Sequence, residues 1–449
     1  MIKYIIVILY GFINVSFANA EMDNLETSPP NKKITIPGVT ITSEGPSQTN
    51  TGEGKIGSQV IGTITGPDAL LHEPANPMLR ATTPIPRRSI ATRNLKAHDV
   101  KAATSVGQII TDGIPQKKLD ERWSCTAFCV AGNVIATSAH CLAKAKGGSL
   151  PSLDNITFRL RSYVLNGTNS SKVFFGPYES SKLQSVDEKN PHLSVYSGYD
   201  FKPQTVASAA NDWALAKLTR PVCSGKSVSL HPMKDKELIN AGKSGRLYML
   251  AYDRWNGIEP LVSRGCKIFS RSNAKKFGRN LRRTLRRNKA ILIHDCSGVN
   301  GSSGGPIFIN VDGVPHVVAI NRGGIKTERR IPIKRVRRGN KISITYKIIK
   351  QNIKTATHVG AIAKGLKRFR EESILNSLEE FKEVQTYLKQ SHLYRGKIDG
   401  LLGPGTKRAL MRYEEKTGLV PIGLPTQRLL SILRKEFQTE TVDRTTNGQ

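Results

Sequence analysis

The chain has 449 residues, and its 68 lysine and arginine residues against 35 aspartate and glutamate residues give a formal net charge of +33. This length predicts two or three domains, since domains usually contain ~100–200 residues. Beyond the N-terminal stretch no apolar run reaches the ~18 residues needed to span a bilayer, and there is no Gly-X-Y period or heptad array, so multi-spanning membrane proteins and fibrous proteins are excluded.

The N-terminus has the pattern of a secretory signal peptide. A short basic start precedes the mostly apolar Tyr4–Val15, and Ala18-Asn19-Ala20 fits the small-x-small cleavage pattern. We therefore expect residues 1–20 to be cleaved off and the protein to be exported. The alternative is an uncleaved N-terminal anchor, which is disfavoured because two polar residues shorten the apolar block, Asn14 and Ser16.

Residues 21–95 are rich in Pro, Thr, Ser, Gly and Asn, and no aromatic residue occurs between Phe17 and Trp123. A segment without large side chains cannot offset its ordering entropy by burial. Residues 21–95 are therefore predicted to be a disordered linker or pro-region, and ordered structure is expected to begin between residues 96 and 120.

Six cysteines follow this segment, at Cys125, Cys129, Cys141, Cys223, Cys266 and Cys296. An even number of cysteines in an exported chain favours disulfides. A metal site is the competing interpretation, because Cys125, Cys129 and the pair His140-Cys141 could be arranged as ligands. Export and the lack of a second cluster of paired ligands disfavour that interpretation, so we expect no metal.

From Trp123 to about Val359 the chain contains short apolar runs separated by Gly, Pro, Asn and Asp. These runs are Cys129–Ala136, Ile156–Leu165, Trp213–Leu218, Arg246–Ala251, Ala290–His294, Ile307–Val311 and His316–Ile320. Many short strands with turns between them favour a mainly β barrel or sandwich. Two strongly basic segments, Arg264–Lys289 and Arg322–Lys354, are expected to be surface insertions because like charges resist packing.

The apolar spacing becomes helical from about Glu371. A first predicted helix carries Ile374, Leu375, Leu378, Phe381, Val384 and Leu388. A Gly-rich turn leads to a second helix, capped by Thr406 and ending at Gly418, and Pro425-Thr426 starts a third. We predict a linker over residues 366–378, a three-helix domain over residues 379–436 and a disordered tail over residues 437–449.

The sharpest chemical motif is Gly301-Ser302-Ser303-Gly304-Gly305-Pro306. A nucleophilic serine needs a base, backbone N–H donors for the developing oxyanion and an uncrowded approach, and flanking glycines provide the last two. His140 follows an apolar strand, and Asp212 opens another, where a shielded carboxylate can hold the second nitrogen of the histidine. Each of these features alone has another explanation. The serine motif could be an ordinary Gly/Ser loop, His140 a core histidine and Asp212 a turn residue.

In the order His140, Asp212, Ser303, these motifs together resemble the trypsin-like (chymotrypsin-fold) serine proteases of an exported bacterial type. The resemblance implies two six-stranded antiparallel β-barrels in a domain over residues 96–365, and no cofactor. It implies that His140 is the general base, that Asp212 orients it and that Ser303 is the nucleophile. The backbone N–H groups of Gly301 and Ser303 would form the oxyanion hole.

The resemblance also implies the disulfides Cys125–Cys141 and, by similarity to the bacterial branch, Cys266–Cys296. Cys129 and Cys223 then remain as a pair.

The position that sets primary specificity, six residues before the nucleophile, would be Ser297, and Gly323 and Gly324 would keep the pocket wall open. Serine at that position favours a neutral or apolar substrate side chain. A cationic rim formed by Arg322 and the basic residues after it would instead attract acidic substrates, so the cleavage preference stays open.

A second resemblance, to the peptidoglycan-binding-like domain of cell-wall enzymes, covers residues 379–436. Its most specific element is Asp399-Gly400-x-x-Gly403-Pro404-x-Thr406, and Tyr413-Glu414 departs from the usual Phe-Gln. The implied partner is peptidoglycan, and the alternative is a helical module that only braces the protease or binds protein.

The charge of +33 suits binding to anionic envelope polymers, although a solvated basic surface explains it equally well. No nucleic acid is expected, because no basic platform studded with aromatic residues is visible.

The sequence therefore predicts an exported serine endopeptidase, periplasmic or secreted, that hydrolyses peptide bonds through a Ser-His-Asp triad and associates with the cell wall. The alternative is a catalytically silent protease-fold protein that serves as a cell-envelope binding module.

Overall fold

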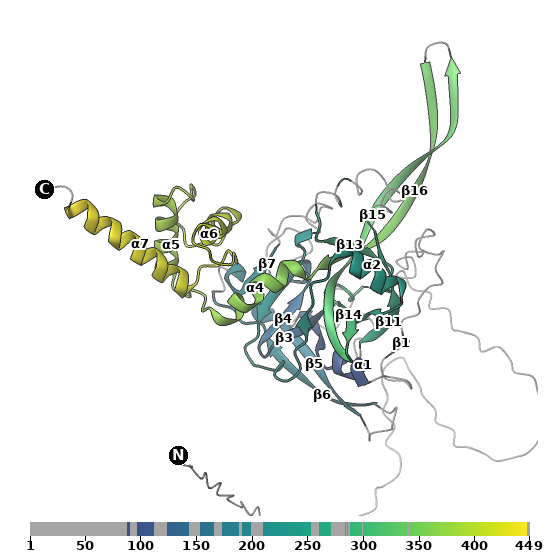
Figure 1. The fold of residues 1–449 in the computed structure, drawn as a ribbon, viewed down its shortest axis with the longest axis horizontal. Coiled ribbons are helices and arrows are strands. Elements are labelled where there is room, and N and C mark those ends of the chain that lie inside the picture. The colour runs from purple at the N-terminus through teal and green to yellow at the C-terminus, as the bar shows by residue number, and fades with distance from the viewer. Residues whose placement is uncertain are drawn as a thin grey trace, which may run out of the picture. The chain divides into compact units, whose positions relative to one another are not determined.

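Two antiparallel β-sheets and a C-terminal group of helices form the described part of the protein (Figure 1). The computed structural model describes residues 88–89, 97–111, 124–142, 153–165, 173–187, 191–198, 210–252, 260–270, 288–298, 300–338 and 341–446, with Arg283 and Leu285. The predicted signal peptide and nearly all of the predicted linker or pro-region lie outside these residues. Within the described ranges, no helix is both long enough and apolar enough to cross a membrane.

The first sheet has seven strands in the order β6-β5-β2-β3-β4-β8-β7. They are β2 (Val106–Thr111), β3 (Ser124–Ala131), β4 (Val134–Thr137), β5 (Ile156–Leu165), β6 (Val173–Lys182), β7 (Val195–Ser197) and β8 (Ala214–Lys217). The run Cys129–Ala136, predicted as one strand, spans the end of β3, a turn and the start of β4, because Gly132-Asn133 reverses the chain. Fully buried apolar side chains from these strands, among them Ile135 and Phe158, form the core.

The second sheet has nine strands, eight of them in the order β1-β11-β10-β14-β15-β16-β13-β12, and β9 pairs with β15. They are β1 (Arg88–Ser89), β9 (Ser229–Leu230), β10 (Leu247–Ala251), β11 (Leu261–Cys266), β12 (Ile268–Phe269), β13 (Ile291–His294), β14 (Pro306–Val311), β15 (Val314–Arg338) and β16 (Lys341–His358). Two short helices accompany the sheets, α1 (Ala97–Ala103) and α2 (Asp235–Lys243).

The predicted mainly β class with two antiparallel sheets is confirmed, but the strand numbers differ from six in each sheet. The additional strands are short: β1, β9 and β12 have two residues each, and β7 has three. Short edge strands of this kind depend on the tertiary position of the chain more than on local sequence, so an apolar pattern does not reveal them.

The basic segment Arg322–Lys354 forms a long two-stranded ribbon. β15 has 25 residues and β16 has 18, and they stay paired from Ala319–His358 at the sheet to Arg338–Lys341 at the far end. Figure 1 shows this ribbon extending away from the sheet. The predicted insertion is therefore a continuation of two core strands. Most of the other basic segment, beyond Ser270, lies outside the described residues.

The C-terminal helices are α4 (Gly360–Glu371), α5 (Leu378–Gln390), α6 (Pro404–Lys416) and α7 (Gln427–Thr446). α4 occupies the start of the predicted linker, because Ile362 and Phe369 supply a buried face for a helix there. α7 continues to Thr446, through most of the segment predicted to be a disordered tail.

Thr406 does not cap α6 as predicted. The N-cap is Gly403, and the Thr406 hydroxyl instead donates to the carbonyl of Leu401 at 3.1 Å. Thr426 does serve the following helix, since its hydroxyl oxygen accepts from the N–H of Leu429 at 3.2 Å.

Candidate active site

His140 is held on a short 3-10 turn, η3 (Ala139–Cys141), directly after β4. The disulfide Cys125–Cys141 ties this turn to β3. The backbone N–H of His140 donates to Asp212 Oδ1 at 2.9 Å, which fixes the turn on its other side. The turn therefore gives the imidazole one defined position beside Asp212.

Asp212 lies just before β8 and is 1 % exposed. Its Oδ2 atom is 2.8 Å from His140 Nδ1. Burial works to raise the pKa of Asp212, but the charges and hydrogen bonds of His140, together with the charge of Arg322, hold that pKa below its usual value. An ionised Asp212 accepts the Nδ1 proton, which assigns the neutral tautomer that leaves His140 Nε2 free to act as a base.

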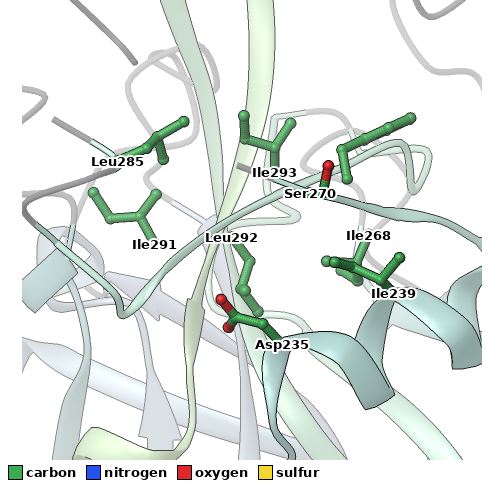
Figure 2. Close-up of a pocket in the computed structure, with 9 residues that line it drawn as sticks. Asp235, Ile239, Ile268, Ser270, Leu285, Ile291, Leu292 and Ile293 are labelled. Atoms are coloured by element: carbon green, nitrogen blue, oxygen red, sulfur yellow. The ribbon is translucent and has the colours of Figure 1, made fainter. Parts of the chain in front are cut away.

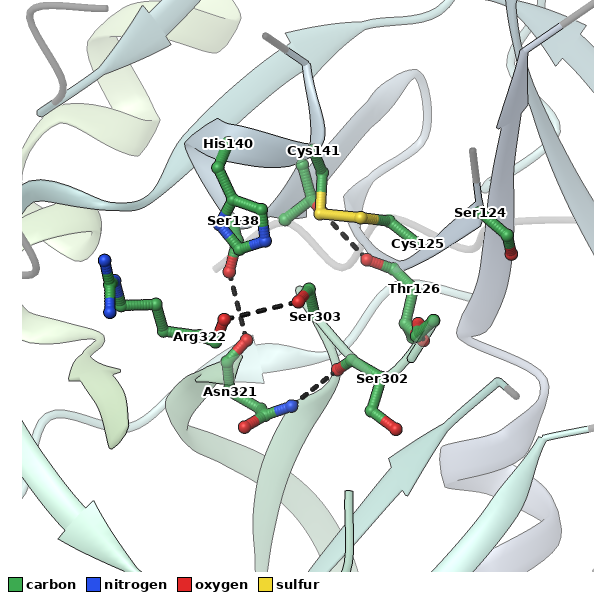
Figure 3. The surroundings of a disulfide bond; sticks show 12 residues. Ser124, Cys125, Thr126, Ser138, His140, Cys141, Ser302, Ser303, Asn321 and Arg322 are labelled. Carbon is green, nitrogen blue, oxygen red and sulfur yellow. Dashed lines mark hydrogen bonds between the residues drawn. A yellow bond between two sulfur atoms is a disulfide. The ribbon is translucent and has the colours of Figure 1, made fainter. Parts of the chain in front are cut away.

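Ser303 lies on the loop that leads into β14, and its hydroxyl donates to the carbonyl of Arg322 at 3.2 Å. No hydrogen bond between the Ser303 hydroxyl and His140 is present among the described residues. The two segments are nevertheless adjacent, because a Cβ atom on Gly304 would lie 3.1 Å from the backbone nitrogen of Ser138, which caps η3. Figure 3 shows His140 and Ser303 on these segments beside the disulfide. Catalytic hydrogen bonds of an unliganded enzyme are often loose and tighten when substrate binds.

The loop around Ser303 leaves two backbone donors unpaired. Gly301 and Gly304 have φ values of 94° and 83°, which favour glycine. In the described part of the chain the N–H groups of Gly301 and Ser303 have no acceptor, whereas those of Gly304 and Gly305 donate to Asn321 O and Ser302 O. Free N–H groups beside a serine hydroxyl are what an oxyanion requires.

Comparison with protein families identifies both parts of the chain. Residues 114–336 match the family described as "Trypsin". The protein contains a trypsin-like serine protease domain. Residues 377–433 match the family described as "Putative peptidoglycan binding domain", so a domain of that family follows the protease domain. No curated protein matches the chain by sequence.

Thr126, on β3, holds in place the loop that carries Ser303. Its N–H donates to Ser303 O at 2.8 Å, and its hydroxyl donates to Gly301 O at 2.8 Å. A Cβ atom on Gly304 would come within 2.0 Å of Thr126 O, so only glycine allows the loop to approach β3 this closely. Sequence reasoning missed Thr126, because nothing in its neighbourhood in the chain marks it.

Asn321, on β15, supports the same loop from the second sheet. Its side-chain Nδ2 donates to Ser302 O at 2.7 Å, and its carbonyl accepts from Gly304 N at 2.7 Å and from the Ser138 hydroxyl at 3.0 Å (Figure 3). Asn321 Oδ1 lies 3.1 Å from Nε2 of the buried His294. Asn321 thus connects the histidine turn and the serine loop, a role that the sequence did not indicate.

Arg322 was predicted to belong to a cationic rim around the substrate pocket, but the structure places its side chain in the interior. It is 7 % exposed, and its Nε donates to Asp212 Oδ2 at 2.9 Å. The guanidinium group thus contacts the same carboxylate oxygen as the His140 imidazole. Arg322 is a buried partner of Asp212, so its charge does not face solvent around a substrate pocket.

The three predicted specificity residues have different surroundings. Gly323 lies beside Ser303, because a Cβ atom there would lie 3.5 Å from the Ser303 hydroxyl. Gly324 is exposed and pairs with Lys354 across the ribbon. The N–H of Ser297 donates to the Ser263 hydroxyl at 2.9 Å, and Lys354 Nζ donates to the carbonyl of the preceding Cys296 at 3.0 Å. The structure therefore brings Gly323 close to the Ser303 hydroxyl, and Lys354 links Gly324 to Cys296, the residue before Ser297.

The three predicted disulfides, Cys125–Cys141, Cys129–Cys223 and Cys266–Cys296, are all present. The sulfur atoms of Cys125 and Cys141 lie within 4.8 Å of a His140 nitrogen. Since both sulfur atoms belong to a disulfide, they offer no thiolate to a metal ion.

A small pocket lies elsewhere in the second sheet, between α2 and the strands β12 and β13 (Figure 2). Its lining is mainly apolar: Ile239, Ile268, Phe269, Leu285, Ile291, Leu292 and Ile293, with Asp235 and Ser270. None of the predicted catalytic residues lines it.

In the C-terminal domain, Gln385 organises the turn that carries the sequence motif. Its side-chain oxygen accepts from the N–H groups of Asp399 and Gly400, and its Nε2 donates to Asp399 Oδ1 at 3.0 Å. Asp399 Oδ1 also accepts from Leu401 N at 2.9 Å, the bond by which an aspartate stabilises a turn. Gly400 has a φ of 71°, and a Cβ atom there would meet the Leu378 side chain at 2.2 Å, so this position requires glycine.

The departure at Glu414 also has a structural reason. Glu414 is fully buried and accepts from Arg368 Nη1 of α4 at 2.6 Å, and its other oxygen accepts from the N–H groups of Ile422 and Gly423. A carboxylate at this position therefore neutralises a buried arginine from the preceding helix.

Proposed function

We propose that the protein is an exported serine endopeptidase that cleaves peptide bonds through Ser303, His140 and Asp212 and is held near the cell wall by its C-terminal domain. The observation that carries this proposal is the contact between His140 Nδ1 and Asp212 Oδ2 at 2.8 Å, close to a serine loop with unpaired N–H donors.

In the first half of the proposed reaction, the Ser303 hydroxyl rotates away from Arg322 O and attacks the carbonyl carbon of the scissile bond while His140 Nε2 takes its proton. Asp212 stabilises the imidazolium that forms. The N–H groups of Gly301 and Ser303 hold the oxyanion of the tetrahedral intermediate, and one such donor is worth ~3–4 kcal/mol of transition-state stabilisation.

His140 then returns the proton to the departing amine as the C–N bond breaks, which leaves an ester between the substrate acyl group and Ser303. In the second half, His140 takes a proton from water as the water oxygen attacks the ester. The ester bond breaks, the acid product leaves, and the proton returns to the Ser303 oxygen.

Substrate selection in this proposal involves Ser297, Gly323 and Gly324. The absence of a side chain at Gly323 leaves room for a substrate residue beside the nucleophile. Lys354 pairs with Gly324 across the ribbon, whereas Arg322 is paired with Asp212.

Export and an oxidising compartment, periplasmic or extracellular, are supported by the three disulfides and by the family of the C-terminal domain. The signal-peptide pattern of residues 1–20 points the same way.

Labelling with a fluorophosphonate probe tests the proposed chemistry without a known substrate. The probe should attach covalently to the mature wild-type protein, and Ser303→Ala should remove the label. If the wild-type protein and Ser303→Ala both remain unlabelled after removal of the N-terminal segment, the protease fold serves the alternative function, that of a silent envelope-binding protein.

Two partners are proposed for retention at the envelope: peptidoglycan through residues 379–436, and anionic polymers through the basic ribbon. The segment Arg322–Lys354 contains twelve lysine and arginine residues and one acid, Glu328, and most of it belongs to the extended ribbon. Binding by charge falls with salt, whereas binding by a shaped site depends on salt much less.

A sedimentation assay separates these two partners. The full-length Ser303→Ala protein is mixed with purified peptidoglycan, either with its anionic polymers attached or stripped of them, at low and high salt. Retention on stripped peptidoglycan at high salt supports the C-terminal domain as the binding module. Retention only on polymer-bearing peptidoglycan at low salt assigns binding to charge, and the family of residues 377–433 would then have no ligand here.

A further inference from the structure

Arg322 touches two of the three proposed catalytic residues. Its side-chain Nε donates to Asp212 Oδ2 at 2.9 Å, and its backbone carbonyl accepts from the Ser303 hydroxyl at 3.2 Å. Both Arg322 and Asp212 are almost completely buried, at 7 % and 1 % exposure. The contact is therefore a desolvated ion pair, which solvent and salt screen weakly.

Asp212 Oδ2 is shared between two donors. His140 Nδ1 lies 2.8 Å from it, and Arg322 Nε lies 2.9 Å from it. The other oxygen, Oδ1, accepts from the backbone N–H of His140. With a neutral imidazole, the carboxylate and the guanidinium balance each other, so the buried cluster has no net charge. A proton on His140 would then add a positive charge close to a positive charge that is already present.

Two ionisable side chains meet at the Asp212 carboxylate: His140, from η3, and Arg322, from β15. The described residues beside the histidine on η3 and β3 include the uncharged Ala139 and Thr126 and the disulfide Cys125–Cys141.

We propose that Arg322 is a positioning residue that holds Asp212 in place. Because Arg322 and His140 both bind the Oδ2 atom of Asp212, His140 is a weaker base than it would be if Arg322 did not bind that atom. This inference rests on the proposed triad. It predicts that the enzyme keeps an unprotonated, working His140 at more acidic pH than it would without Arg322. A carboxylate that also binds Arg322 stabilises the imidazolium less than a carboxylate that binds His140 alone. The pH range of activity therefore extends to more acidic values, and the rate at neutral pH is lower.

The test is the pH profile of fluorophosphonate labelling, whose acid limb reports protonation of the base. Arg322→Met and Arg322→Gln both remove the charge, and the glutamine keeps a donor for Asp212. Arg322→Lys keeps the charge and serves as the control. The acid limb should move to higher pH by roughly one to two units in both neutral variants, as expected for a buried unit charge that contacts the same carboxylate oxygen as the imidazole. In Arg322→Lys the limb should stay near its wild-type position.

An acid limb at the wild-type position in a folded, labelled Arg322→Met or Arg322→Gln protein would overturn the proposal while leaving the serine protease assignment intact. If the wild-type protein and Ser303→Ala instead react equally with the fluorophosphonate probe, the proposed triad itself is wrong. If neither neutral variant folds, the smaller neutral variant Arg322→Ser takes their place. An acid limb at higher pH than in the wild-type protein supports the proposal, and an acid limb at the wild-type position contradicts it.

Discussion

The backbone N–H of Thr126 donates to the carbonyl oxygen of Ser303 at 2.8 Å, so a strand of the first sheet directly holds the proposed nucleophile, which lies on a loop of the second sheet. The Thr126 hydroxyl adds a second contact, to Gly301 O at 2.8 Å, and itself accepts from Tyr252 N at 2.9 Å. One buried threonine thus sets the backbone on both sides of the proposed oxyanion hole, and its hydroxyl can be removed without changing the size of the side chain.

Thr126→Val should lower the rate of labelling and turnover more than it weakens substrate binding. Valine has nearly the same shape but removes the hydroxyl's hydrogen bonds to Gly301 O and Tyr252 N, and the loss of a buried hydrogen bond costs about 1–3 kcal/mol of stability. The loop can then turn its N–H donors away from the oxyanion. We therefore expect kcat to fall roughly 10–100-fold, no more than the fall caused by complete loss of one oxyanion-hole donor.

The matched control is Thr104→Val, which removes a hydroxyl that bonds Lys101 O at an exposed position. Thermal denaturation and labelling rates of the two variants should be measured together. If Thr126→Val and Thr104→Val label at the same rate, Thr126 does not shape the site.

Asp212→Asn should nearly silence the enzyme while leaving it folded. The asparagine amide cannot accept the Nδ1 proton and Arg322 Nε as the carboxylate does, so His140 is driven to the tautomer that lacks a free Nε2 base. The expected loss is roughly 10⁴-fold in turnover. Turnover of a peptide substrate and the melting temperature should be measured, and normal cleavage by a correctly folded Asp212→Asn protein would remove Asp212 from the triad.

The catalytic candidates could be predicted from sequence because each has a local marker. Ser303 lies among glycines, His140 lies beside a cysteine, and Asp212 opens an apolar strand. Thr126 and Asn321 have no such marker, since their partners lie far away in the chain: 175 residues separate Thr126 from Gly301. Only the packing of the two sheets brings these groups together.

Arg322 is a residue for which the local sequence pattern gave the wrong environment. It is the first residue of Arg322–Lys354, a segment that contains twelve lysine and arginine residues, and a segment of this composition is expected to lie in solvent. The segment indeed continues as the extended ribbon, but its first residue still belongs to the core part of β15, directly after the buried Asn321. Composition averages over a whole segment, so it cannot show that an individual residue of a basic segment, here Arg322, is buried and ion-paired.

His294 should make the protease domain less stable in mild acid. Burial, aided by the charge of Lys354, lowers the pKa of His294 to about 4, from 6.5 in an unfolded chain. Because the folded-state pKa is the lower one, the stabilising contribution is complete above pH 6.5 and is lost as the pH falls toward 4. The loss in free energy of unfolding is about 2–3 kcal/mol between pH 7 and pH 4.5.

Denaturant unfolding of the wild-type protein and of His294→Gln at these two pH values measures this contribution. Glutamine can still donate to Asn321 Oδ1 but does not titrate, so the variant should lose about 2–3 kcal/mol less than the wild type on acidification. An equal loss in both proteins would assign the acid sensitivity to other groups.

Glu414→Gln should destabilise the C-terminal domain and leave the protease domain active. Glu414 is buried and takes a hydrogen bond from Arg368 Nη1 at 2.6 Å, so the neutral amide removes half of a buried ion pair. Arg368 keeps Glu372, to which its Nε donates at 2.7 Å, so we expect a loss of about 1–3 kcal/mol, less than for an arginine left with no partner.

The control for this variant is Glu415→Gln, an exposed position on the same helix with the same change of charge. Circular dichroism at 222 nm follows melting of the helices, and fluorophosphonate labelling follows the protease domain. Glu414→Gln should lower the melting temperature of the helical signal and Glu415→Gln should not, while both proteins label at the wild-type rate. Identical melting of the two variants would mean that the pair with Arg368 contributes no net stability, as is known for buried ion pairs whose desolvation offsets their attraction.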